Sequence, residues 1–403
     1  MGKKLNWKEK IFNQISFPTN EILQKVLDGK NITPNDAYTL YKTSSQNLPL
    51  LMFIANYLRN EFYSNIISFS KNVFIDVTHL CRNKCAYCGF RQEPEKTPNL
   101  ILSIEEILKI ARKGKQLGCK EALITLGEKP ELKYKRYKDL LRTIGNYSTT
   151  IEYLRDICEL IFNETGLLPH CNPGVLEKNE LQALREVNAS LGLMLETSSS
   201  RLLEKGAPHE YSPGKDPQLR INTIKYAGEL NVPFTTGILV GIGETYKERI
   251  DSIFKIKELH KKYGHIQEII IQNFLPKKNT PMQTRPSPSL IEMLKIVCIT
   301  RIIFQGKMNI QIPPNLNENN LEVFLLSGIN DWGGISPLTK DFINPEKEWP
   351  SLQKLLAITR RSGFQLKERL PIYPEFARKD KFISKLLKTK IKSLIDENGF
   401  VKK

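Results

Sequence analysis

Seven short apolar runs, spaced along the chain from Val73 onward, constrain the fold more than any other feature of the sequence. The runs are VFIDVT (73–78), EALITL (121–126), LLPHCN (167–172), LGLMLET (191–197), FTTGILVG (234–241), EIIIQNF (268–274) and NIQIPP (309–314). Longer stretches with helical spacing separate them, such as SIEEILKIARKGKQLG after Ser103. Strands that alternate with helices indicate βαβ units and a parallel sheet. With a candidate eighth run near GINDWGGIS, the pattern predicts the α/β class and a (β/α) barrel of the TIM type rather than an open sheet.

The segments on either side of the predicted barrel are expected to be helical extensions. Thr33 before Pro34 has the residue types of a helix start, and LPLLMFIANYLRNEFY continues as a second helix. The tail from about residue 351 is typical of accessory helices. We therefore expect an N-terminal helical extension over 1–70, the barrel over 71–350, and C-terminal accessory helices over 351–403.

The chain carries a formal net charge of +17, which raises the question of nucleic-acid binding. The basic residues are spread along the whole chain, with a local excess in RKDKFISKLLKTKIKSL (378–394). Apolar residues recur there at helical spacing, so the segment predicts an amphipathic helix with a solvated Lys-rich face. Charge of one sign is by itself non-specific, and we expect no nucleic-acid partner.

No apolar run is long enough to span a bilayer, and MGKKLNWKEK at the start has no apolar core of a secretory signal. We therefore expect no membrane association and a cytoplasmic location. Thiols stay reduced in that compartment, so clustered cysteines indicate metal or redox chemistry rather than disulfides.

Three of the seven cysteines fall within HLCRNKCAYCGFR (79–91), as Cys81, Cys85 and Cys88. They follow the first predicted strand directly, at the end of the barrel where catalytic loops gather. A structural zinc site has four closed ligands, which would need His79 as the fourth, and this zinc interpretation stays open at this point. The other four cysteines are scattered singly and are expected to be ordinary core residues: Cys119, Cys158, Cys171 and Cys298.

The C-x3-C-x2-C spacing, with Tyr87 before the last cysteine, resembles the radical S-adenosylmethionine (SAM) superfamily. The resemblance implies that Cys81, Cys85 and Cys88 bind three irons of a [4Fe–4S] cluster. SAM then fills the open fourth iron, and electron transfer from the reduced cluster yields methionine and a 5′-deoxyadenosyl radical. That radical performs the abstraction, so the resemblance names no catalytic side chain.

The same resemblance implies further SAM-binding residues at later strand ends. Gly127 and Glu128 in TLGEKPE match the element that meets the SAM amino group, and Glu196 and Arg220 match residues around its amino acid moiety. Gly241 belongs to GILVGIGET, which matches the element that supports the adenine. Taken singly, such residues are as typical of a turn or a surface ion pair.

Nine ordered blocks between residues 33 and 350, among them LPHCNPG, HEYSPGKDPQLR and GINDWGGISPLTKDFINPEKEWP, resemble the small subunit of FO synthase, the CofG family. That family makes the deazaflavin 7,8-didemethyl-8-hydroxy-5-deazariboflavin (FO). The implied substrate is 5-amino-5-(4-hydroxybenzyl)-6-(D-ribitylimino)-5,6-dihydrouracil, a tyrosine–ribityluracil adduct supplied by a partner adduct-forming radical SAM subunit. The implied reaction is hydrogen abstraction, loss of ammonia and ring closure, with a low-potential reductant.

Polar residues near later strand ends suit the ribityl chain and the uracil edge of such a substrate. The candidate contacts are His170, Asn172, Gln272, Asn273, Asn315, Asn330 and Asp331. Trp332 and Tyr211 are candidates for stacking on its rings, with core packing as the alternative. The competing functional hypotheses are another enzyme of the biotin-synthase-like radical SAM class and a zinc-stabilised basic nucleic-acid-binding protein.

Overall fold

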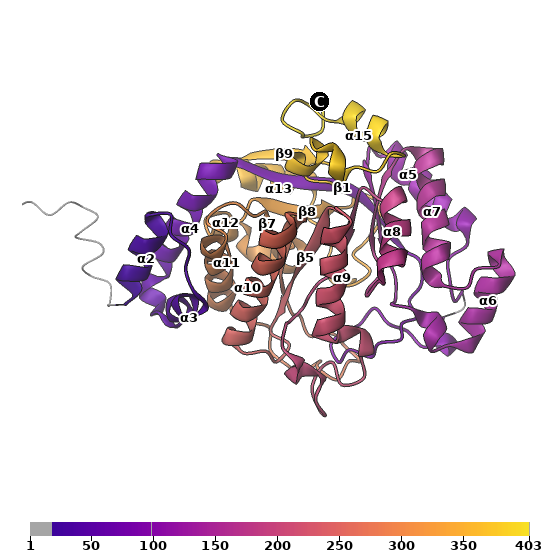
Figure 1. Ribbon diagram of the computed structural model, residues 1–403, viewed down its shortest axis with the longest axis horizontal. Coiled ribbons are helices and arrows are strands. Elements are labelled where there is room, and N and C mark those ends of the chain that lie inside the picture. Colours follow the sequence, from indigo (N-terminus) through magenta and orange to yellow (C-terminus); the bar gives the residue numbers. More distant parts are fainter. Residues whose placement is uncertain (1–17, 98, 403) are drawn as a thin grey trace, which may run out of the picture.

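A closed barrel of eight parallel strands forms the centre of the computed structural model, which describes residues 18–97 and 99–402 (Figure 1). The strands are β1 (Ile66–Asp76), β2 (Glu121–Thr125), β3 (Leu168–Asn172), β4 (Ser190–Gly192), β5 (Phe234–Val240), β6 (Ile266–Asn273), β7 (Ile310–Gln311) and β8 (Asp331–Ile335). Each strand pairs with the next, and β1 pairs with both β2 and β8, which closes the barrel. The predicted class, the barrel and all eight predicted strands are confirmed.

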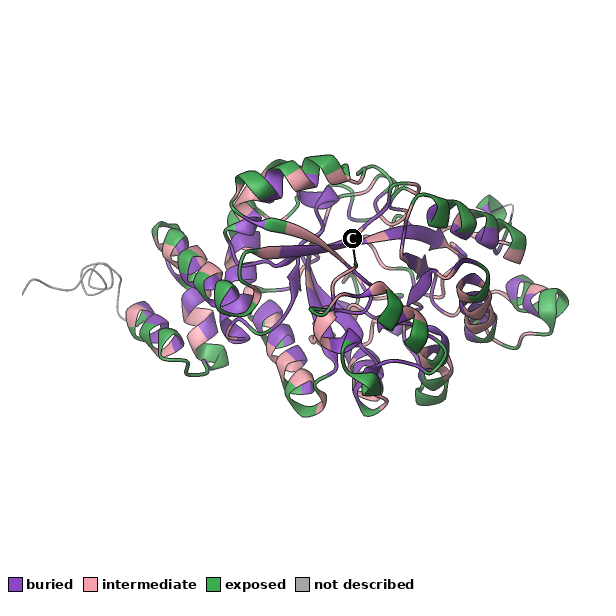
Figure 2. Cartoon of the chain, turned by 90° about the horizontal axis from the view of Figure 1, so that it is seen from above, coloured by how far each residue is buried: buried purple, intermediate pink, exposed green. Residues whose placement is uncertain are grey.

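Helices connect the strands on the outside of the barrel. They are α5 (Ile104–Gln116), α6 (Lys135–Gly145), α7 (Thr150–Thr165), α8 (Lys178–Val187), α9 (Pro217–Glu229), α10 (Tyr246–Tyr263), α11 (Leu290–Ile303), α12 (Leu321–Leu325) and α13 (Leu352–Arg361). Several begin with a Ser or Thr cap whose side chain accepts from the third helical N–H, as Ser103 does for α5. Figure 2 shows the result: the strands of the barrel are mostly buried, and the helices around it expose their outward faces.

Within the described residues, three helices precede the barrel: α2 (Thr19–Leu27), α3 (Pro34–Lys42) and α4 (Leu48–Tyr63). Residues 1–17 of the predicted helical extension lie outside the described part of the chain. Thr33 caps α3 in a reciprocal arrangement with Asp36, as the Thr-Pro pair predicted. At the left of Figure 1, α3 packs against α10 and α11, α4 packs against α11, and α2 packs against α3. The strand that follows them starts at Ile66, so β1 is seven residues longer at its beginning than the predicted run from 73 and crosses the expected 70/71 boundary.

The C-terminal tail differs from the expectation of accessory helices alone. A ninth strand, β9 (Gln365–Arg369), pairs with Ile66–Ser70 of β1, whereas β2 pairs only with the second half of β1. The early part of β1 would otherwise leave backbone groups unpaired on that side, and β9 satisfies them. The tail therefore completes the sheet at the amino-terminal end of the barrel, over which the C-terminal segment lies (Figure 1).

The single amphipathic helix predicted over 378–394 is wrong for most of its length. The segment holds a short 3-10 turn at Asp380–Phe382, and only α15 (Lys388–Leu394) is α-helical; a four-residue helix, α14 (Pro374–Ala377), precedes it. Phe382, Leu387 and Ile391 are buried in a separate apolar cluster with Leu370 and Tyr373. Burial of these side chains against the end of the barrel overrides the local helical spacing.

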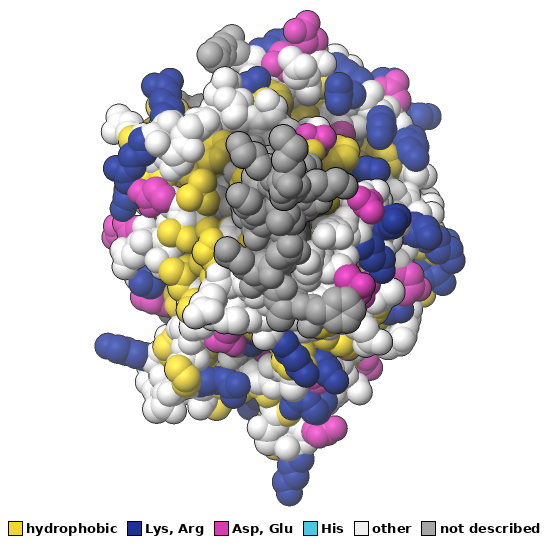
Figure 3. All heavy atoms as spheres, turned by 90° about the vertical axis from the view of Figure 1, so that its left-hand side faces the viewer, with side chains coloured by type: hydrophobic (Ala, Val, Ile, Leu, Met, Phe, Trp, Pro, Cys, Tyr) yellow, Lys and Arg dark blue, Asp and Glu magenta, His cyan; other side chains and the backbone are white. Residues whose placement is uncertain are grey.

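Among the described residues, no helix is both long and apolar enough to cross a bilayer. Figure 3 shows the face that carries the N-terminal helices, where Lys and Arg are dispersed among acidic side chains rather than gathered. Apolar side chains also show on this face, and Phe53 and Tyr57 of α4 are among the exposed large apolar residues of the chain.

Candidate active site

A cavity of about 400 Å³ occupies the barrel, and all nine strands contribute lining residues. That volume lies in the range of small-molecule sites. Cys81, Cys85 and Cys88 all line it, from the loop that follows β1. The other four cysteines are buried and do not line it, and the Sγ atoms of Cys158 and Cys171 lie 3.3 Å apart in the core. The sequence therefore separated the two groups of cysteines correctly by position.

The cysteine loop has no regular secondary structure and is held by backbone contacts. The amide of Ala86 donates to the carbonyl of Pro208 at 2.9 Å, and that of Cys88 donates to the carbonyl of Cys85 at 3.1 Å. Gly127 packs so closely below the loop that a Cβ atom there would lie 1.8 Å from the carbonyl oxygen of Leu80. Only glycine fits that position, which explains the glycine of the predicted Gly-Glu pair.

The cysteines fit a cluster better than a single zinc ion. Both ring nitrogens of His79 are engaged: Nδ1 donates to the carbonyl of Phe90 at 2.9 Å, and Nε2 lies 2.7 Å from Asp76 Oδ2. The fourth ligand that a zinc site would need is therefore not available. Among the described residues, no three His, Cys, Asp or Glu side chains gather around the position of one ion. A cluster instead spreads its thiolates over separate irons.

One backbone contact favours the thiolate that a cluster needs. The amide of Glu128 donates to Cys81 Sγ at 3.2 Å. Burial raises the pKa of the Cys81 thiol to about 12, so cluster binding must displace the proton. N–H donors to cysteine sulfur are among the contacts that tune iron–sulfur clusters.

Two of the residues expected to bind SAM lie together in the cavity wall. Glu128 Oε1 accepts from Nε and Nη2 of Arg82 at 2.8 and 2.7 Å, and Glu128 Oε2 lies 3.8 Å from Arg220 Nη2. Arg220 also donates through Nε to the carbonyl of Gly214 at 2.8 Å. A Cβ at Gly214 would lie 1.7 Å from Glu128, so the glycine leaves the space that this carboxylate fills. The structure thus joins Glu128 and Arg220, although their SAM contacts stay a prediction.

Glu196 lines the cavity beside a cation that the sequence analysis assigned no role. Lys215 Nζ lies 2.5 Å from Glu196 Oε1, and the ammonium is 5.8 Å from the centroid of the Tyr87 ring. Glu196 has a φ of 63°, a left-handed conformation that is costly outside glycine and common at functional sites. Lys215 lies inside the HEYSPGKDPQLR block, which the sequence singled out, but the sequence did not indicate that Lys215 pairs with Glu196.

Tyr87 and Gly241 flank the cavity in different ways. The Tyr87 hydroxyl lies 2.9 Å from His209 Nε2, and burial raises the pKa of Tyr87 and lowers that of His209 to about 2. Gly241 does not line the cavity; with a φ of 102° it turns the chain after β5 and donates to Glu244 Oε1 at 2.7 Å. In its place the β5 side chain of Leu239 faces the cavity.

Five of the seven candidate substrate contacts line the cavity: His170, Asn172, Gln272, Asn273 and Asn315. The Nδ1 atom of His170 lies 2.6 Å from Ser190 Oγ, and burial together with the charge of Arg369 lowers the pKa of His170 to about 4. The neutral ring is therefore the form present near neutral pH. Whether these five residues touch substrate stays a prediction.

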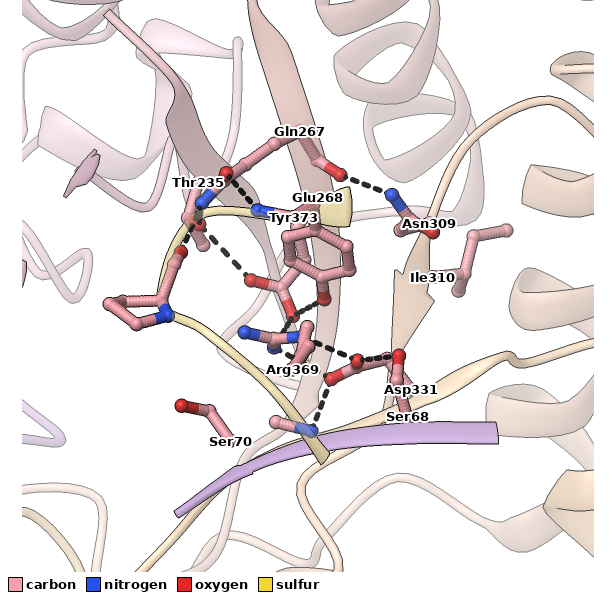
Figure 4. A network of polar contacts seen from close by, with 12 residues as sticks. Ser68, Ser70, Thr235, Gln267, Glu268, Asn309, Ile310, Asp331, Arg369 and Tyr373 are labelled. Atoms are coloured by element: carbon pink, nitrogen blue, oxygen red, sulfur yellow. Dashed lines mark hydrogen bonds and ion pairs between the residues drawn. The ribbon is translucent and has the colours of Figure 1, made fainter. Parts of the chain in front are cut away.

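Asn330 and Asp331 do not line the cavity, contrary to the expectation. β8 starts at Asp331, so both residues lie at the amino-terminal end of their strand, opposite the cysteine loop. Asn330 Oδ1 accepts from Arg301 Nη2 at 2.7 Å, and Asp331 accepts two hydrogen bonds from Arg369 (Figure 4). Both are structural groups of the barrel end.

The two aromatic candidates also lie elsewhere. Trp332 is fully buried and donates through Nε1 to Thr359 Oγ1 at 3.2 Å, and Tyr211 is 64% exposed. Neither lines the cavity. Trp349 does, and its buried Nε1 has no hydrogen-bond partner within residues 18–97 and 99–402.

The polar residues deep in the barrel were not predicted from the sequence. Asn72, Glu121, Glu268, Gln311 and Arg369 line the cavity. Asn72 lies inside β1, directly before the apolar run predicted there; Glu121, Glu268 and Gln311 lie within predicted apolar runs, and Arg369 comes from the tail. The barrel pattern alone predicts apolar side chains at such inward positions, so no local signal marked them.

Comparisons with known proteins point to the same site. The Radical SAM superfamily pattern matches residues 75–256, which include the cysteine loop. A 7,8-didemethyl-8-hydroxy-5-deazariboflavin synthase of Methanopyrus kandleri is 49% identical over 337 residues, which cover 84% of this chain and 100% of that protein. The synthase of Methanocaldococcus jannaschii is 49% identical over 86% of this chain and 93% of its own length. FO synthase of Streptomyces coelicolor is 42% identical over 94% of this chain and 45% of its own length.

Solved structures share the fold. Methylornithine synthase (PylB) superposes with a TM-score of 0.67 at 22% identity, covering 86% of this chain and 97% of that one. HydG, a maturase of the [FeFe]-hydrogenase, superposes with a TM-score of 0.74 at 19% identity, covering 95% of this chain and 83% of that one. At these identities the likeness concerns the barrel and not the substrate.

Proposed function

This chain belongs to the radical SAM superfamily and, within it, to the 7,8-didemethyl-8-hydroxy-5-deazariboflavin (FO) synthases, and from that membership we propose its substrate, its reaction class and the roles of its residues. It is a radical SAM enzyme that forms FO in deazaflavin biosynthesis, with a [4Fe–4S] cluster and SAM as cofactors. The observation that carries this conclusion is the 49% identity along the full length of a relative that has this name. Its substrate is a small molecule, and a reductant is needed.

The substrate in our proposal is the hydroxybenzyl–ribityliminouracil adduct, and the enzyme is an ammonia lyase. When bound, the cluster and SAM supply hydrogen-atom abstraction. Abstraction of one hydrogen atom from the adduct is followed by loss of ammonia, closure of the central ring and loss of one electron and one proton, so that SAM, split into methionine and 5′-deoxyadenosine, is the net two-electron oxidant. The polar walls of the cavity support this choice, because a uracil edge and a ribityl chain both need donors and acceptors.

The roles proposed for the cysteines and the SAM-binding side chains follow from their positions in the cavity wall. Cys81, Cys85 and Cys88 hold the cluster. Glu128 and Glu196 accept from the SAM amino group, and Arg220 meets its carboxylate, because a planar guanidinium suits a carboxylate. Arg82 and Lys215 keep these carboxylates in place when no SAM is bound.

A separate adduct-forming subunit is part of the proposal. The match to the Streptomyces coelicolor FO synthase covers 45% of that protein, so this chain corresponds to less than half of it. This supports a second polypeptide that supplies the adduct. We also propose a low-potential reductant and a cytoplasmic location, the latter supported by seven cysteines that are all free.

Anaerobic turnover tests the proposal. The reconstituted protein, given SAM, a low-potential reductant and the adduct, should form fluorescent FO together with ammonia, 5′-deoxyadenosine and methionine. Tyrosine and the ribityl-diaminouracil without a partner subunit should give no FO. The Cys81→Ala protein, treated identically, is the matched control and should give none from the adduct either. Consumption of adduct without FO, or turnover of tyrosine alone, would contradict the assignment to this reaction.

A further inference from the structure

The deep part of the cavity is polar, where barrels of this kind are usually filled with branched apolar side chains. We call this the polar floor, and it consists of Asn72, Glu121, His170, Glu268, Gln311 and Arg369. The six residues come from six different strands, β1, β2, β3, β6, β7 and β9. Several strands therefore converge on one polar region.

Strand register places the polar floor away from the cysteine loop. Asn72 is paired with Glu121, the first residue of β2, and Gln311 is paired with Asp331, the first residue of β8. Arg369 pairs with Ser70 of β1, which precedes the cysteines by more than ten residues. The polar floor thus lies at the amino-terminal half of the barrel, and the cysteine loop lies at the other end.

Most side chains of the polar floor already have partners. Glu268 accepts from the hydroxyl of Tyr373 at 2.7 Å, and Arg369 is held by Asp331 (Figure 4). His170 contacts Ser190, and Glu121 accepts from Ser70. These groups have a structural reason to be where they are.

Asn72 differs from them. Its side chain is fully buried and lines the cavity, yet neither Nδ2 nor Oδ1 forms a hydrogen bond with any residue in the described part of the chain. A buried amide without a partner costs stability, and such groups need an explanation in a native protein. The explanation that the geometry offers is a ligand, because Asn72 is one of the residues that line the cavity.

The hydrogen-bond donors and acceptors of the polar floor determine which class of ligand can bind there. The amides of Asn72 and Gln311 offer donors and acceptors together, and the carboxyls of Glu121 and Glu268 stand beside them. Burial raises the pKa of Glu121 and raises that of Glu268 to about 7, so the Glu268 carboxyl can both donate and accept near neutral pH. A phosphate or carboxylate would meet these acidic groups here, and the guanidinium of Arg369 is already paired with Asp331. Hydroxyl groups suit this surface, since each donates one hydrogen bond and accepts others.

We propose that the polar floor binds the polyol chain of the substrate, with Asn72 as a specificity-determining contact, and that it disfavours a phosphorylated chain. This inference rests on the proposed function, which provides a substrate with one ribityl chain. The orientation agrees with the chemistry, because the hydroxybenzyl end must lie near the cysteine loop. When the ribityl chain lies on the polar floor, the hydroxybenzyl end of the substrate lies at the other end of the cavity, near the cysteine loop.

Equilibrium dialysis of the anaerobically reconstituted protein, with fluorescence detection of the deazaflavin, tests the inference without turnover. The probes are FO, its 5′-phosphate, and an analogue with a methyl group in place of the ribityl chain. The wild-type protein should bind FO at least about tenfold more tightly than either other probe. Asn72→Leu should weaken FO binding about tenfold and leave binding of the methyl analogue unchanged. Asn222→Ala, on the outer surface of α9, should change neither.

Thermal unfolding without ligand separates a binding role from a structural one. Because the Asn72 amide has no protein partner among the described residues, Asn72→Leu should unfold at the wild-type temperature or higher. A lower unfolding temperature would assign the amide a structural role and overturn the inference. Gln311→Met replaces a second side chain of the polar floor by an apolar one of similar shape, and it should show the same selective loss of FO binding. This variant controls for a local packing defect caused by the substitution at Asn72.

The remaining outcomes separate this inference from the proposed function. If wild-type protein binds FO and the methyl analogue equally, or if Asn72→Leu weakens both equally, the polyol site is elsewhere while FO synthesis stands. If the wild-type protein binds FO no better than serum albumin does and forms none from the adduct, both proposals fall.

Discussion

Arg369 and Asp331 form a buried, two-point ion pair at the amino-terminal end of the barrel. Nε of Arg369 donates to Oδ2 of Asp331 at 2.7 Å, and Nη2 donates to Oδ1 at 2.8 Å (Figure 4). Asp331 belongs to β8 of the barrel, whereas Arg369 ends β9 of the tail. Arg369 also lies 3.6 Å from Glu268, and its guanidinium stacks 3.9 Å from the Tyr373 ring centroid. The tail is therefore joined to the barrel by a shared set of buried charges.

Replacement of Arg369 by Met should lower the free energy of unfolding by about 3–5 kcal/mol, because it leaves Asp331 and Glu268 buried without a countercharge. Urea unfolding measures the change. Arg361→Met is the matched control: its pair with Glu322 is exposed, and its loss should cost no more than about 1 kcal/mol. Equal stabilities for the two variants would show that the tail does not depend on this pair.

The barrel was predictable from the sequence because each strand is a short apolar run between helical stretches, and eight such runs fix the class. The cysteine loop was predictable because its spacing is local. Residues whose position depends on where a strand starts were harder. Asn330 directly precedes β8 and Asp331 is its first residue, so neither follows the strand, and GINDWGGIS has glycines on both sides of the tryptophan.

The polar floor was not predictable, for a different reason. Arg369 enters the barrel only because β9 pairs with the first half of β1, and this pairing joins residues about 300 positions apart in sequence. Asn72 lies within a strand, where the period of two shows which residues share a face but not that the face lines a cavity. The helical spacing of apolar residues in 378–394 predicted the wrong structure for a related reason. Burial of these side chains against the end of the barrel determines the conformation of the segment.

Cys81→Ala should abolish cluster binding, whereas Cys119→Ala and Cys298→Ala should retain it. Cys81 lines the cavity with Cys85 and Cys88, and the two control cysteines are buried in the core. Iron and sulfide content after anaerobic reconstitution, together with the visible absorbance, gives the result. An unchanged iron content in Cys81→Ala would contradict the proposed ligand set.

The stability of the protein should depend on pH through Glu268. Burial raises the pKa of Glu268 from 4.5 to about 7 in the folded state. The folded state therefore holds this proton more tightly than the unfolded chain does. The stabilisation that it contributes is complete below pH 4.5 and is lost as the pH rises through about 7. Glu268→Gln removes that dependence, so the wild type should lose stability relative to the variant over this interval.

His170 titrates in an overlapping interval with the opposite sign, because its pKa is lowered to about 4 and its contribution is lost as the pH falls. The comparison must therefore be the difference between wild type and Glu268→Gln, in which the His170 contribution is common to both. Urea unfolding of the two proteins at several values between pH 4.5 and 7 gives that difference. A difference that does not vary with pH would show that Glu268 keeps its charge in the fold.

Neutral replacements of the three proposed SAM contacts should weaken SAM binding and keep the cluster. Glu128, Glu196 and Arg220 line the cavity near the cysteine loop, and loss of one charge-assisted contact costs about 1.5–3 kcal/mol, or roughly 10- to 150-fold in affinity. Alanine variants of all three, titrated with SAM under anaerobic conditions, give the affinities, and iron content shows that the cluster is intact. Glu292→Gln, whose carboxylate pairs with Arg249 outside the cavity, should bind SAM as the wild type does.

The three variants differ in how directly they report SAM binding. Because Glu128 is also held by Arg82, its variant should lose some stability as well. Glu196 is paired with Lys215 alone among the described cations, so its variant reports SAM binding more directly. Wild-type affinity in all three variants would place the SAM amino acid group on other residues of the same cavity.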